Sequence, residues 1–220
     1  GMQSRTARKR GNEYYDIFNS ALEITPKGEI DIYHKSRLVI GVEKMPLPWL
    51  FKMLEFLVID LGGTVGQLGV GVEPKVFDNG DKRVGPAICY EGVYGEFFGD
   101  HVRRGAELMA ILSNDGWWGN TLGHIYLFNF CRLRAIETRR DIARSANTGV
   151  SGFISSRGDV EQRLDWDQRG LLQQEVEVRH DKTIYSTYGD WVGRMSLLIS
   201  FLTLLYYSAY RVRRKNHLVD

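Results

Sequence analysis

The C-terminal segment constrains the fold of this chain more than any other feature. From Met195 to Tyr210 the sequence MSLLISFLTLLYYSAY is uncharged, and four cations follow between Arg211 and Lys215. Sixteen residues rise only about 24 Å as an α-helix, less than the roughly 30 Å hydrocarbon core of a bilayer. An extension back to Trp191 gives a segment of twenty residues, provided that the Arg194 side chain carries its charge to the head groups.

Two interpretations of this segment are open, a membrane span and a buried core helix. Trp191 at one end and Tyr206, Tyr207 and Tyr210 near the other suit the aromatic belts of a membrane interface. A core helix rarely runs directly into four cations. The pattern therefore favours a transmembrane helix over residues 191–210 with a basic cytoplasmic tail over 211–220, which places the preceding residues on the outer side.

The overall composition excludes several classes of protein. The 220 residues are 43% hydrophobic and 25% charged, values that exclude wholesale disorder and collagen-like structure. A net charge of +2 gives no footprint for nucleic acid. Two cysteines are too few for a disulfide framework or a four-thiolate zinc site, and the five histidines show no ligand spacing. We expect neither a metal nor a cofactor.

The basic, polar stretch Ser4–Gly11 lacks the apolar run of a signal peptide. Residues 1–11 are therefore predicted to be a linker or lead-in, and residues 12–190 a single domain. A topology that exports this domain needs upstream sequence, so the chain is interpreted as a C-terminal fragment.

Short apolar runs and turn signals alternate through the domain, which indicates an α/β fold with a mixed sheet. Helices are expected at 97–105 and 126–141. Strands are expected at 14–24, 30–33, 75–77, 84–90, 107–113, 142–146, 150–155 and 171–178.

The apolar segment Pro48–Asp60 fits two descriptions equally, a buried helix and an interfacial helix that dips into lipid. The glycine-rich stretch that follows, residues 62–71, matches no phosphate-binding pattern and is predicted to be a flexible loop.

Residues with chemical potential gather around Cys89. This cysteine follows an apolar strand and has Glu91 two residues later, which places its thiol at a strand tip. A lysine such as Lys35 would lower the pKa of the thiol and stabilise a developing oxyanion, while a carboxylate would act as general base. Cys131 lies on the apolar face of the helix at 126–141 and is predicted to be core.

Five motifs in order resemble the carbon–nitrogen hydrolase (nitrilase) superfamily. Within it, the ICYE form, the paired tryptophans and the terminal helix are similar to the apolipoprotein N-acyltransferases. The motifs are Tyr33–Lys35, Ile88–Glu91, Ser113–Gly119, Arg134–Glu137, and Asn147–Ile154 with Gly158.

The resemblance implies an αββα sandwich, with its N-terminal strands missing, on the periplasmic side of a bacterial inner membrane. It implies transfer of a fatty acyl chain from a phospholipid to the N-terminal amine of a diacylglyceryl-cysteine lipoprotein. Cys89 would be the nucleophile and Lys35 the oxyanion stabiliser. The other residues carried over, Glu91, Glu43, Tyr90, Trp117 and Trp118, would support the nucleophile or border the site.

One departure from the family concerns the general base, a glutamate that lies before the YxK motif in a W-P-E-like context. Before Lys35 this chain offers only Glu13, Glu23 and Glu29, none in such a setting. We therefore expect the base to be missing and the isolated chain to be inactive. Two alternatives stay open, a nitrilase or amidase that hydrolyses small amides and a catalytically dead, membrane-tethered interaction module.

Overall fold

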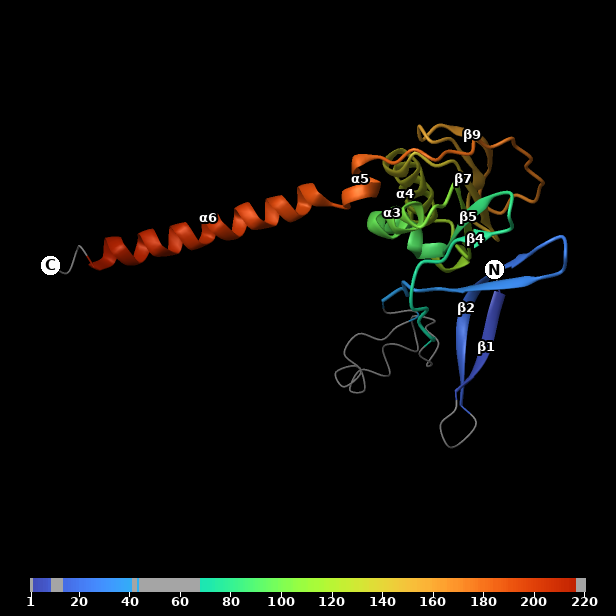
Figure 1. Cartoon of the computed structure of the whole chain (residues 1–220), viewed down its shortest axis with the longest axis horizontal. Helices are drawn as coiled ribbons and strands as arrows, with labels where there is room; N and C mark the ends of the chain where they lie inside the picture. Colours follow the sequence, from blue (N-terminus) through green and yellow to red (C-terminus); the bar gives the residue numbers. More distant parts are fainter. Residues whose placement is uncertain (1, 9–13, 41–42, 44–67, 217–220) are drawn as a thin grey trace.

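The computed structural model describes residues 2–8, 14–40, 43 and 68–216. Its strands form two sheets, a three-stranded sheet in the order β1-β2-β3 and a six-stranded sheet in the order β4-β5-β6-β7-β8-β9 (Figure 1). The helices outside the smaller sheet that an αββα sandwich requires are not among the described residues.

The three-stranded sheet is antiparallel throughout. It comprises β1 (Met2–Arg8), β2 (Tyr14–Ile24) and β3 (Ile30–His34), and the predicted turn between β2 and β3 closes with Gly28 at φ 81°. β1 differs from the linker predicted for residues 1–11. It pairs with residues Tyr14–Ser20 of β2, where the Ser4 and Ser20 hydroxyl oxygens lie 2.6 Å apart, so pairing with β2 outweighs the polar composition of β1.

The six-stranded sheet has a parallel centre and antiparallel edges. β4 (Phe77–Asp78) pairs with β5 (Arg83–Ile88) across the predicted Asn-Gly turn. β5, β6 (Leu108–Ser113) and β7 (Ile142–Ala146) run parallel. Their carboxyl ends meet at one edge, where α/β proteins place their sites.

The two parallel connections each contain a helix. α3 (Gly95–Arg103) links β5 to β6, and α4 (Leu122–Thr138) links β6 to β7. α4 begins four residues before the predicted start at Tyr126, because the Thr121 hydroxyl caps it by accepting a hydrogen bond from the Gly123 amide. Phe97 and Phe98 of α3 and Phe128 of α4 are buried in the core with strand residues such as Ile111.

The predicted strand at 171–178 is wrong. The strand after β8 (Ser151–Ile154) is β9 (Val160–Leu164), on the far side of the predicted Arg157-Gly158-Asp159 turn. Residues 171–178 form no ladder in the structure and are held in part through side chains, as where the Gln162 amide donates to the Gln173 carbonyl.

Two other predictions have clear outcomes. Cys131 is a core residue as predicted, since it is buried and its thiol donates to the Leu127 carbonyl at 3.1 Å. The segment Pro48–Asp60 lies outside the described residues, as does the glycine-rich stretch up to residue 67.

The chain ends in α5 (Ile184–Tyr188) and α6 (Trp191–Asn216), and α6 projects away from the domain (Figure 1). Residues Trp191–Arg211 form a 21-residue stretch that contains an 18-residue window with a mean hydropathy of 1.3, and no residue of that window is buried. The buried core helix is therefore excluded. α6 has the length and composition of a single transmembrane helix.

Buried His101 makes stability depend on pH. Burial lowers the pKa of His101 from 6.5 to about 4, and its Nδ1–H donates to the Phe97 carbonyl at 2.9 Å. Between these pH values the unfolded chain binds more protons than the folded one, so stability is complete above pH 6.5 and declines as the pH falls toward 4. The decline from this group reaches about 3 kcal/mol.

Denaturant titrations in detergent micelles between pH 7 and pH 4 measure the free energy of unfolding of the unsubstituted chain and of His101→Phe. The difference between the two pH profiles is the contribution of His101. In His101→Phe the decline in stability that comes from His101 is expected to disappear. In the control His180→Asn, which alters an exposed histidine, this decline is expected to remain. Parallel pH profiles for the unsubstituted chain and His101→Phe would contradict the assignment.

Candidate active site

Cys89 occupies a strained backbone position at the tip of β5. It opens the short 3₁₀ helix η1 (Cys89–Val93) with φ 53°, in the left-handed region that residues other than glycine rarely adopt. Such strain persists where the surroundings enforce it and is concentrated at functional sites. The predicted position of Cys89 at a strand tip is thus found.

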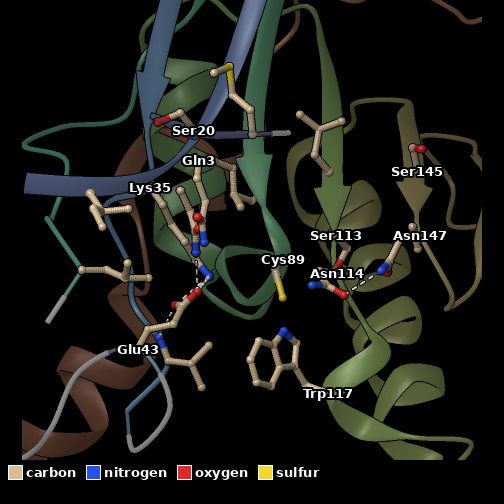
Figure 2. A pocket seen from close by; sticks show the side chains of 18 of the residues that line it. Gln3, Ser20, Lys35, Glu43, Cys89, Ser113, Asn114, Trp117, Ser145 and Asn147 are labelled. Atoms are coloured by element: carbon tan, nitrogen blue, oxygen red, sulfur yellow. Dashed lines mark hydrogen bonds and ion pairs between the residues drawn. The ribbon is translucent and has the colours of Figure 1, made fainter. Parts of the chain in front are cut away.

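The Cys89 thiol points into a cavity of about 760 Å³ (Figure 2). Lys35 and Glu43 lie on one side of the sulfur, Asn114 and Asn147 on the other, and the Trp117 indole lies across from it. The wall combines polar groups with apolar side chains. These apolar residues include Ile17, Val39, Leu68, Ile88 and Leu112.

Lys35 is a buried cation held by a carboxylate. Its Nζ lies 2.8 Å from both oxygens of Glu43, and the Lys35 residue is completely buried. Glu43 also accepts hydrogen bonds from the Asn19 amide at 2.7 Å and the Val39 backbone N–H at 2.8 Å. The pair lines the cavity, and the carboxylate fixes the ammonium in place there.

Glu91 lies behind the nucleophile and does not line the cavity. Its Oε1 accepts from the Tyr33 hydroxyl at 2.7 Å and from the Ser36 and Arg37 amides at 2.7 and 3.1 Å. Its Oε2 accepts from the Ile88 amide at 2.8 Å. Burial raises the pKa of Glu91, while these donors act to lower it. The Glu91 carboxylate thereby connects the segment that follows Lys35 to the turn that carries Cys89.

The remaining predicted residues divide into two groups. Trp117 and Trp118 both line the cavity and are exposed to solvent. Tyr90 is half-buried, does not line the cavity, and packs edge-on against Tyr94 with ring centroids 5.7 Å apart. The structure thus brings Lys35, Glu43, Cys89 and the tryptophans to one cavity and keeps Tyr90 and Glu91 behind it.

Sequence reasoning missed a second buried ion pair beneath the cavity. Asp115 and Arg144 are both buried, with the Arg144 Nη2 2.8 Å from the Asp115 Oδ2. The Asp115 amide donates to the Asn147 side chain, whose amide donates to Asn114 at 2.8 Å. The pair therefore fixes both loops that carry the far wall. Asp115 lies within the Ser113–Gly119 motif, but no local pattern in the sequence indicates that Arg144 pairs with it.

Removing one partner of this pair is expected to be costly. Asp115→Ala leaves the Arg144 cation buried without its counter-charge and should lower the free energy of unfolding by about 3–5 kcal/mol. The exposed pair Arg163–Asp165 is the matched control, and Asp165→Ala should change stability by less than about 1 kcal/mol.

Denaturant titration measures both values. The double variant Asp115→Leu/Arg144→Met removes both charges and should recover part of the loss. Equal, small effects of Asp115→Ala and Asp165→Ala would contradict the role of the buried pair.

Glu91 allows a similar test of its connecting role. Glu91→Gln places an amide N–H₂ among groups that all donate, so the free energy of unfolding should fall by about 3 kcal/mol. The rate at which iodoacetamide alkylates Cys89 should also change its dependence on pH, because the turn that carries Cys89 is no longer held in place. Exposed Glu175 is the control, and Glu175→Gln should change stability by less than about 0.5 kcal/mol. An unchanged alkylation profile in Glu91→Gln would show that the carboxylate does not position the turn.

The geometry of a strand-tip cysteine beside a buried lysine–glutamate pair agrees with comparisons to known proteins. The family model described as carbon-nitrogen hydrolase matches residues 4–183. The chain belongs to the carbon–nitrogen hydrolase family.

Curated relatives named apolipoprotein N-acyltransferase match most of the chain. The protein of Chlorobaculum tepidum is 33% identical over 192 residues, which cover 84% of this chain and 36% of the relative. The protein of Geobacter metallireducens is 31% identical over 185 residues, covering 84% and 35%. The protein of Bdellovibrio bacteriovorus is 33% identical over 214 residues, covering 90% and 37%. The chain thus spans just over a third of the length of these relatives.

Solved structures support the fold alone. Nit3 of Saccharomyces cerevisiae, a member of branch 10 of the nitrilase superfamily, matches with a TM-score of 0.53 and 17% identity, over 70% of this chain and 51% of Nit3. XC1258 of Xanthomonas campestris, a CN-hydrolase superfamily protein, matches with a TM-score of 0.50 and 18% identity, over 76% and 59%. The α/β nitrilase-like fold expected from the motifs is confirmed.

Proposed function

We propose that this chain carries the nucleophile, oxyanion-stabilising and membrane-anchoring parts of an apolipoprotein N-acyltransferase. The reaction moves a fatty acyl chain from a phospholipid to the N-terminal amine of a diacylglyceryl-cysteine lipoprotein. One observation carries the proposal: Cys89 and the Lys35–Glu43 pair share a cavity in a domain that continues into the exposed apolar helix α6. The relatives of that name support it.

In the first half-reaction, the Cys89 thiolate attacks the carbonyl carbon of a phospholipid ester. The carbonyl oxygen becomes an oxyanion, which the Lys35 ammonium stabilises by donating hydrogen bonds to it. The C–O bond then breaks, and the glycerol oxygen leaves as a lysophospholipid after it takes up the proton that the base removed from the Cys89 thiol. A thioester remains on Cys89.

In the second half-reaction, the lipoprotein amine attacks the thioester carbonyl. A new C–N bond forms, the C–S bond breaks, and the sulfur leaves as a thiolate, so the product is an amide. The amine must lose a proton during this step, which requires a base. The indole rings of Trp117 and Trp118 provide apolar surface for the acyl chain at the mouth of the cavity.

We further propose that the base comes from a part of the protein outside residues 1–220. Among the described residues that line the cavity, the carboxylate is that of Glu43. Both its oxygens are bound to the Lys35 ammonium, and two further donors approach them. A carboxylate neutralised in this way is a poor proton acceptor. Glu91 is buried behind the turn, bound to Tyr33 and four other donors.

The orientation in the membrane follows from charge. The cations after residue 210 favour a cytoplasmic C-terminus by the positive-inside rule. The domain before Trp191 then lies on the periplasmic face of a bacterial inner membrane. Residues 12–190 would be the carbon–nitrogen hydrolase part and residues 191–210 the span.

Mass spectrometry of Cys89 tests the proposal. The longest natural reading frame that contains this chain, reconstituted with phosphatidylethanolamine, should acquire a palmitoyl-sized thioester on Cys89. Chain 1–220 alone should acquire none, because it lacks the base. In the longer protein, Lys35→Met should lower the rate of adduct formation by about 100-fold or more, since it removes the oxyanion donor. Cys131→Ala is the matched control and should leave the adduct unchanged.

Each other outcome has a defined meaning. Release of ammonia from small amides without a lipid-derived adduct would replace the transferase with a hydrolase. Absence of any adduct on the longer protein, with every acyl donor tried, would favour a non-catalytic interaction module. An adduct on chain 1–220 would overturn the proposed location of the base.

A further inference from the structure

The short segment between the domain and the membrane helix is rigidly attached. α5 is capped by Thr183, whose hydroxyl donates to the Glu137 carbonyl of α4 at 2.5 Å. Arg103 of α3 donates to the Ser186 carbonyl of α5 at 2.6 Å, and Ser186 is buried. α5 is therefore tied to both helices of the domain and cannot act as a free linker.

A second set of contacts fixes the first turn of α6. Glu96 Oε1, near the start of α3, accepts from the Asp190 backbone N–H at 3.0 Å and from the Arg194 guanidinium at 2.5 Å. Gly189, at φ 71°, leaves room for this carboxylate, because a Cβ there would lie 2.6 Å from the same oxygen. We call these four residues, Glu96, Gly189, Asp190 and Arg194, the joint. The joint sets the direction in which α6 leaves the domain.

Three large side chains around the base of α6 are exposed in the part of the chain that the structure describes. Ile184 and Tyr188 are each 67% exposed and lie on one face of α5, four residues apart. Trp191, the first residue of α6, is 49% exposed. We call Ile184, Tyr188 and Trp191 the collar. Figure 1 shows α5 beside the base of α6, on the side from which α6 projects.

We propose that the collar lies in the head-group layer of the same bilayer that α6 crosses, and that the joint holds it there. The collar is continuous with the membrane span: Tyr188 lies three residues before Trp191, so their Cα atoms are at most about 11 Å apart. The head-group layer is about 5–7 Å thick on each side of the hydrocarbon core. Tyrosine and tryptophan, with an apolar ring and a polar atom, are the residues that prefer this layer. This inference depends on the membrane span in the proposed function and not on acyl transfer.

The position of the nucleophile follows from this arrangement. Cys89 and Glu96 are joined by η1 and three further residues. At about 2.0 Å per residue in a 3₁₀ helix and about 3.5 Å in extended chain, their Cα atoms are at most about 19 Å apart. Tyr90 and Tyr94 pack edge-on along this route. The joint thus keeps the nucleophile turn close to the bilayer surface, from which an acyl donor arrives.

Lipid-borne quenchers test the location of the collar. In a Cys89→Ser/Cys131→Ala background, single cysteines introduced by Ile184→Cys, Tyr188→Cys, Leu198→Cys and Arg157→Cys are labelled with bimane. The full chain is reconstituted in phosphatidylcholine vesicles with a nitroxide on the head group or on carbon 12 of the acyl chain. Leu198, within α6, reports insertion, and Arg157, exposed in the β8–β9 turn, is the control far from α6 in sequence.

The labels at 184 and 188 should lose most of their fluorescence with the head-group quencher. The label at 198 should lose most of its fluorescence with the acyl-chain quencher, and the label at 157 should be quenched by neither. If 198 is quenched and 188 behaves like 157, the inference is overturned while the span stands. If 198 is not quenched, both the span and the inference fail. Quenching at 188 by a nitroxide-labelled second copy, and not by lipid, would show that the collar is a protein interface and would overturn the inference.

The joint is tested in the same vesicles with Glu96→Gln. Loss of the carboxylate frees the first turn of α6, so head-group quenching at 188 should fall while acyl-chain quenching at 198 is kept. Glu73→Gln, which alters an exposed ion pair with Arg104, is the matched control and should change neither value. Unchanged quenching at 188 in Glu96→Gln would overturn the role of the joint.

Discussion

The buried carboxylate of Glu91 is the interaction on which the site depends. It accepts hydrogen bonds from the end of β5 and from the segment after β3, and these belong to different sheets. An ionised carboxylate is costly to bury without hydrogen-bond donors, so the loss of any of these bonds would leave a buried charge poorly compensated. Cys89 and Lys35 are therefore held in one arrangement, although they are 54 residues apart in the chain.

The other charges of the site follow the same principle. Lys35 and Glu43 neutralise each other at the cavity wall, and Asp115 and Arg144 do so beneath it. Buried pairs of this kind add little net stability, but the loss of one partner is expensive. They consequently fix geometry. The loops of Cys89, Asn114 and Asn147 converge at the carboxyl edge of the parallel strands, and the buried charges hold them in one arrangement.

Much of the fold was predictable because local signals agree with it. The β2–β3 hairpin has a Pro-Lys-Gly turn, the β4–β5 hairpin has an Asn-Gly turn, and α3 and α4 show helical spacing. Two predictions failed for the same reason: whether a segment forms a strand depends on whether another strand lies beside it to pair with. Met2–Arg8 is polar and basic but completes the edge of β2, while 171–178 alternates as a strand does but forms no ladder.

By itself, the sequence determined the chemistry that is local in the chain: the strand-tip cysteine, the order of the family motifs, and an apolar helix long enough to span a bilayer. It could not determine which of these residues face one cavity. Tertiary structure decided that Tyr90 and Glu91, which follow Cys89 in the chain, do not line the cavity, while Asn114 and Asn147, which follow β6 and β7, do line it. It also decided that Arg144 pairs with Asp115 and that Glu96 holds the base of α6. The physical reason is that burial and charge pairing join residues across sheets and helices, at separations along the chain that no local pattern encodes.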